Sequence, residues 1–167
     1  MSALPAVLEI RPVDYRDPVQ AAALVRLLDA YARDPMGGGE GLSEDVQQRL
    51  PEALAEFPGA FSFMAWIGEE PVGLLNAIMG FSSFAAKPLV NIHDVAVLAA
   101  WRGQGIGTAL LRAVEAEARQ RGACKLTLEV LSGNIRAAAV YAQAGFVLYA
   151  LDPAQGSAQF MQKKLEV

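Results

Sequence analysis

The sequence predicts an α/β fold in which a central mixed sheet of about seven strands is covered on both faces by about four helices. Two observations lead to this fold class. Short runs of aromatic, β-branched and alternating apolar residues recur between turn residues, as strands do. Longer segments between them carry apolar residues three or four positions apart and are bounded by capping residues, as amphipathic helices are.

The first sixty residues are expected to form a strand followed by helices. Residues 8–11 alternate and stop at Pro12, and residues 18–31 have apolar side chains at helical spacing. Four glycines between residues 34 and 41 predict a loop, a candidate substrate gate. Ser43 then caps a short helix, and Pro51 suits the first position of a second helical piece.

Later segments alternate between strands and two further helices. A turn of four residues separates the apolar segments 61–67 and 72–81, and this pattern predicts a β-hairpin. Glycines that follow the helical segments, Gly122 and Gly145, are typical helix stops. The expected strands are residues 61–67, 72–81, 89–97, 125–131, 146–151 and 159–165, and the expected helices are 105–120 and 135–144.

Composition restricts the class of protein. The length of 167 residues fits one domain, 1–167. Hydrophobic residues make up 53% of the sequence, but no uninterrupted apolar run is long enough for a membrane span. A net charge of -4 argues against a nucleic-acid surface. The start of the chain lacks the pattern of a secretory signal, so we expect a cytoplasmic protein. Cys124 is the single cysteine, which excludes an intramolecular disulfide, and we expect it to be buried.

A glycine-rich turn is the strongest functional signal. Residues 95–108 run from an apolar strand through Arg102-Gly103-Gln104-Gly105-Ile106-Gly107-Thr108 into a helix. Such a turn aims backbone N–H groups and the positive end of a helix dipole at one point, where a pyrophosphate fits. Arg102 can add a charge-assisted contact to it.

Two other phosphate motifs fit less well. The P-loop requires a lysine that this turn does not have, which disfavours nucleoside triphosphate hydrolysis. The dinucleotide fingerprint requires a third glycine where Thr108 stands, although Glu129 lies at a suitable distance for a ribose. A nicotinamide-dependent oxidoreductase therefore stays a weak alternative.

Together with a second segment, the turn resembles the GNAT superfamily of acetyl-CoA-dependent N-acetyltransferases. Arg-x-x-Gly-x-Gly after an apolar strand is similar to the acetyl-CoA loop of that family, and residues 134–146 match its second signature, Asn-x-x-Ala-x-x-x-Tyr-x-x-x-Gly-Phe. The resemblance implies a mostly antiparallel sheet whose strands 89–97 and 125–131 splay apart to admit pantetheine. The residues that it implies for acetyl-CoA are Val95, Ala96, Val97, Arg102, Gly103, Gln104, Gly105, Ile106, Gly107, Thr108, Asn134, Ala137 and Tyr141.

His93 is the candidate general base. An amine attacks a thioester only when it is unprotonated, and a histidine titrates near ~6.5, which suits the removal of its proton. Strand alternation would put Asn91 and His93 on one face and Asp94 on the other, unless a β-bulge breaks that parity. Asp94 or a water chain could then serve as the base, or Asp94 could orient His93.

Tyr141 is the candidate general acid. It lies seven residues after Asn134, so both occupy nearly one face of a helix expected to flank the cofactor. Its phenol could protonate the leaving thiolate, while backbone N–H groups at residues 95–97 could stabilise the oxyanion. Asn134 could cap its helix and also contact the cofactor.

These residues predict direct acetyl transfer from acetyl-CoA to a primary amine, without a metal and without an acyl-enzyme. A small-molecule acceptor is favoured, and neither nucleic acid nor membrane is expected as a partner. A protein or peptide amino terminus and a non-catalytic acetyl-CoA-binding module stay open as alternatives. So do acyl groups larger than acetyl and a homodimer through strand 159–165 or exposed sheet edges.

Overall fold

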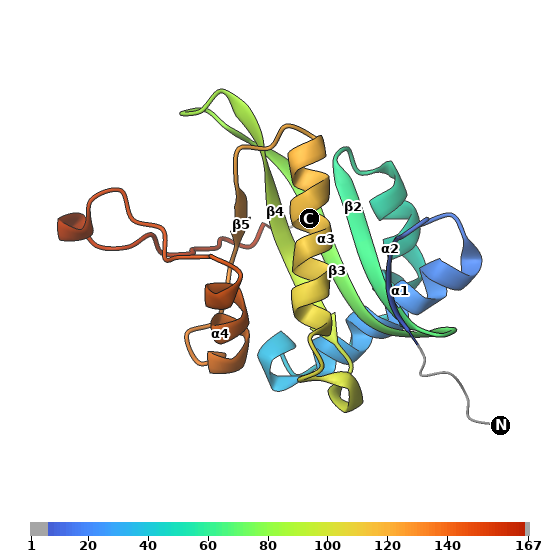
Figure 1. The fold of residues 1–167 in the computed structure, drawn as a ribbon. Helices are drawn as coiled ribbons and strands as arrows, with labels where there is room; N and C mark the ends of the chain where they lie inside the picture. Colours follow the sequence, from blue (N-terminus) through green and yellow to red (C-terminus); the bar gives the residue numbers. More distant parts are fainter. Residues whose placement is uncertain (1–6, 166–167) are drawn as a thin grey trace. The chain divides into compact units, whose positions relative to one another are not determined.

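In a computed structural model the chain is described from residue 7 to residue 165. Its contacts divide it into two units, residues 1–128 and 129–167, each of which we describe by itself. Figure 1 labels the elements in chain order. Residues 1–6, on which the expected lack of an export signal rests, lie outside the described part. Within that part, no helix has both the length and the apolar character required to cross a bilayer.

The first unit contains a mixed five-stranded sheet in the order β1-β2-β3-β4-β5. The first four strands pair antiparallel, and β4 pairs with β5 in parallel. The strands are β1 (Leu8–Pro12), β2 (Ala60–Ile67), β3 (Glu70–Ser82), β4 (Lys87–Val97) and β5 (Leu126–Leu128). The helices of this unit are α1 (Pro18–Arg33), α2 (Glu44–Glu56) and α3 (Ile106–Gln120). The predicted mixed sheet and hairpin are confirmed.

The expected number of about seven strands is wrong, because segments 146–151 and 159–165 form no strand. Their composition suits a strand, but a strand exists only when a neighbour supplies its backbone partners. The two segments belong to the second unit, where Ala158 donates its N–H to the carbonyl of Tyr149 and apolar side chains such as Phe160 stay exposed. The strand expected at 125–131 is likewise shorter and ends at Leu128.

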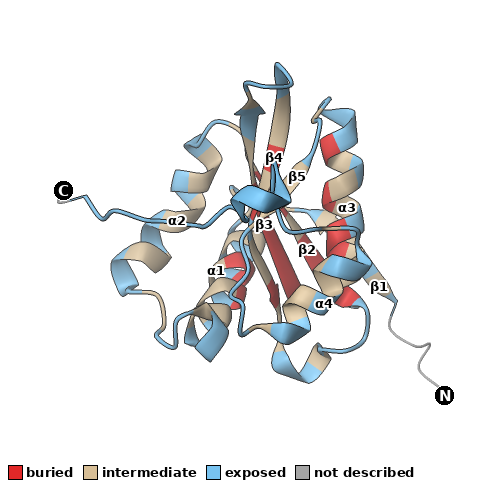
Figure 2. Cartoon of the chain, turned by 90° about the vertical axis from the view of Figure 1, so that its left-hand side faces the viewer, coloured by how far each residue is buried: buried red, intermediate tan, exposed pale blue. Residues whose placement is uncertain are grey.

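Apolar layers cover both faces of the five-stranded sheet. Leu24 and Leu27 of α1 are fully buried against Leu74 of β3 on one face. On the other face α3 approaches closely, since a Cβ at Gly73 would lie 3.1 Å from Cγ2 of Ile106. Figure 2 shows α1 and α2 on one side of the sheet and α3 on the other. Truncating a leucine in such a core costs about 2–5 kcal/mol of stability.

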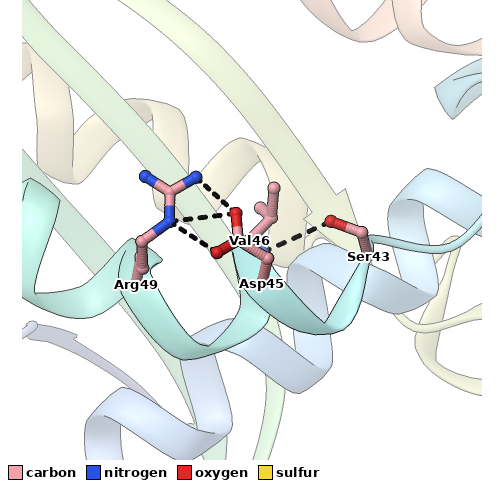
Figure 3. A network of polar contacts seen from close by, with 4 residues as sticks. All are labelled: Ser43, Asp45, Val46 and Arg49. Atoms are coloured by element: carbon pink, nitrogen blue, oxygen red, sulfur yellow. Dashed lines mark hydrogen bonds and ion pairs between the residues drawn. The ribbon is translucent and has the colours of Figure 1, made fainter.

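Helix α2 is one continuous helix, so the expectation of two short pieces divided at Pro51 is wrong. Ser43 caps it as predicted, and its hydroxyl accepts the N–H of Val46 at 3.3 Å. Arg49 and Asp45 form an ion pair one turn further on, which Figure 3 shows beside the cap. A good cap and a helical pair compensate for the hydrogen bond that proline cannot donate.

The second unit contains helix α4 (Ile135–Gln143). Asn134 caps it, because its side-chain oxygen accepts the N–H of Ala137 at 3.2 Å. The helix ends as predicted at Gly145, whose φ of 91° lies in the left-handed region. Phe146 then donates its N–H to the carbonyl of Tyr141, and the two rings meet edge to face at 6.0 Å. With α1, α2 and α3 this gives the expected four helices in the described chain.

Candidate active site

The glycine turn between β4 and α3 has the geometry of an anion cradle. Gly103 and Gly105 adopt φ values of 79° and 80°, where side chains other than glycine are strained. Gly105 caps α3 without any side-chain hydrogen bond, and the helical ladder begins where Ala109 donates to Gly105. The N–H groups of the first helical turn therefore have no partner within the helix. A Cβ at Gly105 or Gly107 would meet no described atom within 4 Å. The cradle is thus open to a ligand.

Arg102 is engaged with protein atoms at the entrance of this cradle. Its Nε donates to the carbonyl of Val97 at 2.9 Å, and its guanidinium forms an ion pair with Asp34 at 2.9 Å. Asp34 also accepts the N–H of Met36, which together with Arg102 holds the pKa of Asp34 below its usual value. Arg102 therefore joins the end of β4 to the loop after α1.

Beyond the bulge at His93, β4 has an open edge. The pairing of β4 with β5 runs from Val90 to Ile92, and among the described strands residues 93–97 pair with β3 alone. Leu98 donates its N–H to Val72 beside β3. Because N–H groups alternate along a strand, those of Val95 and Val97 point to the open edge. These groups are free to meet an extended ligand or an oxyanion.

A β-bulge decides which side chains of β4 share a face. Asn76 pairs with Asp94 and Ala77 pairs with Ile92, so His93 is the extra residue. The insertion shifts parity, and Asp94 faces the same side as Asn76 rather than the opposite side that regular alternation would give. His93 is exposed at the bulge. The two candidate proton acceptors are therefore neighbours at one irregularity of the strand.

A chain of polar side chains crosses the sheet to Asp94. The hydroxyl oxygens of Tyr15 and Ser62 lie 2.7 Å apart. The Ser62 hydroxyl donates to Oδ1 of Asn76 at 2.6 Å, and Nδ2 of Asn76 donates to Oδ2 of Asp94 at 3.0 Å. Ser62 and Asn76 are the buried polar residues of the described core, 3% and 6% exposed. None of Tyr15, Ser62 and Asn76 was a candidate from the sequence. A serine and an asparagine inside apolar strands were the available signal.

The end of α1 brings a phenol close to two carboxylates. Burial raises the pKa of Tyr31, and the charges of Asp94 and Asp34 raise it further. The loop that follows is held rather than free, since Asp29 accepts the N–H of Leu42 at 2.8 Å. Asp34 is paired with Arg102 and Asp29 with Arg33, whereas Asp94 has no ion pair among the described residues, so its half-buried carboxylate suits a cationic ligand.

Three predicted site residues, Asn134, Ala137 and Tyr141, lie in the second unit. The structure assigns Asn134 a structural role as the cap of α4, and Ala137 supplies the N–H that it accepts. Tyr141 is half-buried and packs on Phe146. Cys124, expected to be buried, is exposed beside the turn before β5.

Comparison with known proteins identifies similar chains. A family model described as the acetyltransferase (GNAT) family matches residues 21–146. Streptothricin acetyltransferase of Streptomyces lavendulae is 39% identical over 92 residues, which cover 52% of this chain and 49% of that protein. Streptothricin acetyltransferase A of Bacillus subtilis (strain 168) is 30% identical over 100 residues, covering 60% and 55%. The chain thus spans about half the length of the curated relatives that it matches.

Solved structures share the fold at low sequence identity. An aminoglycoside acetyltransferase from an uncultured soil metagenomic sample, solved with sisomicin, has a TM-score of 0.73 and 21% identity, covering 95% of this chain and 97% of that one. A transcriptional regulator from Bacillus halodurans C-125 has a TM-score of 0.76 and 22% identity, covering 95% and 100%. These likenesses concern the fold alone.

Proposed function

The chain belongs to the GNAT family of acetyltransferases, and we propose that it transfers an acetyl group from acetyl-CoA directly to a primary amine of a small molecule. The observation that carries the proposal is the open cradle at the start of α3 beside the open edge of β4. A small-molecule acceptor is supported by the names of the relatives, which acetylate streptothricin. It is also supported by the half-buried carboxylate of Asp94 near Tyr31, which has no ion pair among the described residues.

Residues of the glycine turn would bind the donor. The N–H groups of Ile106, Gly107 and Thr108 would bind its pyrophosphate, and Gly103, Gln104 and Gly105 would shape the turn around it. The open edge of Val95, Ala96 and Val97 would receive the pantetheine as an added strand. Arg102 would fix the turn through Val97 and Asp34. Asn134, Ala137 and Tyr141 stay proposed donor contacts.

Acetyl-CoA would supply the activated acyl group. The residues of the protein would bind the charged acceptor, stabilise the oxyanion and transfer the protons. Asp94 would hold the acceptor as its ammonium ion, and His93, exposed at the same bulge, would take the proton that makes the amine nucleophilic. The N–H groups of Val95 and Val97 would stabilise the oxyanion of the tetrahedral intermediate. The new C–N bond would form first and give that intermediate. The C–S bond would then break as the intermediate collapses, with Tyr141 donating a proton to the departing thiolate.

A panel of amines tests the proposal. Purified protein is first titrated with acetyl-CoA and with NAD in a thermal-shift assay, then mixed with acetyl-CoA and streptothricin, aminoglycosides, polyamines, amino acids, arylalkylamines or peptides, with free thiol as the readout. We expect acetyl-CoA to raise the melting temperature and at least one small cationic amine to release CoA. Binding without turnover would identify a non-catalytic module instead. Turnover of peptides alone would identify a peptide acetyltransferase, and stabilisation by NAD alone would identify an oxidoreductase.

A matched pair of variants separates the two groups at the bulge. His93→Gln keeps a polar side chain of similar size but removes the proton acceptor, so kcat should fall while the KM of the acceptor changes little. Asp94→Asn keeps the shape and removes the charge, so the KM of the acceptor should rise. An unchanged kcat in His93→Gln would remove His93 from the mechanism.

A further inference from the structure

The hydrogen bonds between Tyr15 and Asp94 have one direction. The carboxylate of Asp94 accepts from Nδ2 of Asn76, which fixes the amide and leaves Oδ1 of Asn76 as an acceptor. Ser62 has a single hydroxyl hydrogen and donates it to that oxygen. Tyr15 must therefore donate to Ser62, and burial raises the pKa of its phenol and keeps the proton in place. Every donor in the chain points toward Asp94.

Packing of the apolar core does not require this chain of hydrogen bonds. Buried polar groups are costly unless they are satisfied, and replacing both partners of such a bond with apolar groups of similar shape is often nearly neutral for stability. Ser62 and Asn76 nevertheless stand on the face where Leu74 and Met64 build the apolar core. The property that apolar residues could not supply is a fixed orientation for the carboxylate of Asp94.

We propose that Asn76, Ser62 and Tyr15 are positioning residues that aim the carboxylate of Asp94 at the ammonium group of the acceptor. The proposal rests on the proposed function, and it makes Asp94 the determinant of specificity for cationic primary amines. With Oδ2 held by Asn76, Oδ1 is presented to the acceptor in one geometry. Neutral amines and alcohols would gain nothing from that arrangement.

Neighbouring groups fit this role. Tyr31 and Asp34 approach from α1 and the loop after it, and His93 adjoins Asp94 at the bulge. Two cations near α1 are already paired, Arg102 with Asp34 and Arg33 with Asp29. Among the described residues Asp94 forms no ion pair, so its charge can meet a positive charge from the substrate.

The test removes the whole chain at once. In the triple variant Tyr15→Phe, Ser62→Ala and Asn76→Leu, each polar partner becomes apolar at similar shape, so no buried group is left unsatisfied. We expect a melting temperature close to that of the natural chain and an unchanged KM for acetyl-CoA. The KM of the acceptor should rise by roughly 10- to 100-fold, as for the loss of a hydrogen bond to a charged group. The kcat of the triple variant should change little.

A double-mutant cycle distinguishes positioning from structure. In the Asp94→Asn background the triple substitution should change the KM of the acceptor by less than about twofold, because residues that act through Asp94 have nothing left to aim. Thr127→Val is the matched control, since it breaks the bond from Asn91 to Thr127, a hydroxyl–amide pair in the same sheet, and it should leave the KM of the acceptor unchanged.

Three results would overturn the proposal. The first is an unchanged KM of the acceptor in the triple variant, and the second is an equal effect in both backgrounds while the natural chain stays active. In either case the proposed function survives. The third is a natural chain that turns over no amine, in which case the proposed function and this inference fail together. If the triple variant does not fold, Tyr15→Phe alone gives the answer, because it removes one hydroxyl and should raise the KM of the acceptor about two- to fivefold only when Asp94 is present.

Discussion

Gly107→Val separates binding from folding at the glycine turn. Gly107 lies in the first turn of α3 with an ordinary helical φ, and a Cβ there would meet no described atom within 4 Å. Valine has a better helix propensity than glycine by about 0.4 kcal/mol. A chain of this length shifts its melting temperature by about 2–4 °C per kcal/mol. The free variant should therefore melt within about 2 °C of the natural chain.

Affinity for CoA should fall in the same variant. The valine methyl groups would occupy the space from which a phosphate reaches the N–H groups of residues 106–108, which the helix leaves unpaired. Losing one charge-assisted hydrogen bond costs about 2 kcal/mol, which corresponds to roughly a 30-fold weaker Kd.

Titration calorimetry with CoA and a thermal melt without it measure the two effects, and Gly107→Ala, which adds one carbon, should weaken binding less. A Kd that valine leaves unchanged would show that no ligand approaches this turn. A large drop in melting temperature would show that the space is not open.

Four further predictions concern single residues. Ser43→Ala removes the cap of α2 and should lower the free energy of unfolding by about 1 kcal/mol in a denaturant titration, with CoA affinity as the unaffected control. Tyr141→Phe should lower kcat on the order of 100-fold while the Kd for CoA stays within twofold, and an unchanged kcat would remove Tyr141 as the acid. Met36 and Arg102 hold the pKa of Asp34 below 3.8, so its contribution to stability is present above that pH and is lost as the pH falls through its folded value. Asp34→Asn should therefore lower the melting temperature at pH 7, and the difference should shrink only as the pH falls below 3.8. Deleting His93 should restore regular pairing of β3 with β4 and keep a cooperative melt while abolishing turnover, so a collapsed fold would contradict our assignment of the extra residue.

Local signals in the sequence were sufficient for most elements. The cap at Ser43, the hairpin of β2 and β3, and the glycine turn each depend on residues close together in the chain. The strands predicted at 146–151 and 159–165 were wrong, because composition indicates only whether a segment can form a strand. Whether it pairs depends on a neighbouring strand. Pro51 was misread because a proline inside a helix can be tolerated when the cap and surrounding contacts hold the helix together.

The donor and acceptor sides of the candidate site differ in the same way. The cradle is contained in six consecutive residues, 102–107, so a motif can reveal it. The acceptor side joins Tyr15, Tyr31, Ser62, Asn76 and Asp94, which come from four different elements and the loop before α1. The sheet register brings Ser62, Asn76 and Asp94 together, and the bulge in the β3–β4 pair sets the position of Asp94. Tyr15 and Tyr31 reach this group from outside the sheet.

The bulge at His93 breaks regular alternation, which is the alternative that the sequence left open, and it puts Asp94 on the same face as Asn91. Asn91 and Asp94 face the side of α1, while Ile92 and Val95 face α3. If His93 is left out, the remaining residues of β4 alternate without a break, so the strand behaves as a regular one with one residue inserted. An insertion that leaves both apolar faces intact contributes nothing to the core. Its effect is to place the exposed His93 next in the chain to a carboxylate that a buried hydrogen-bond chain already holds. In the proposed mechanism this pair would bind the ammonium ion of the acceptor and take its proton.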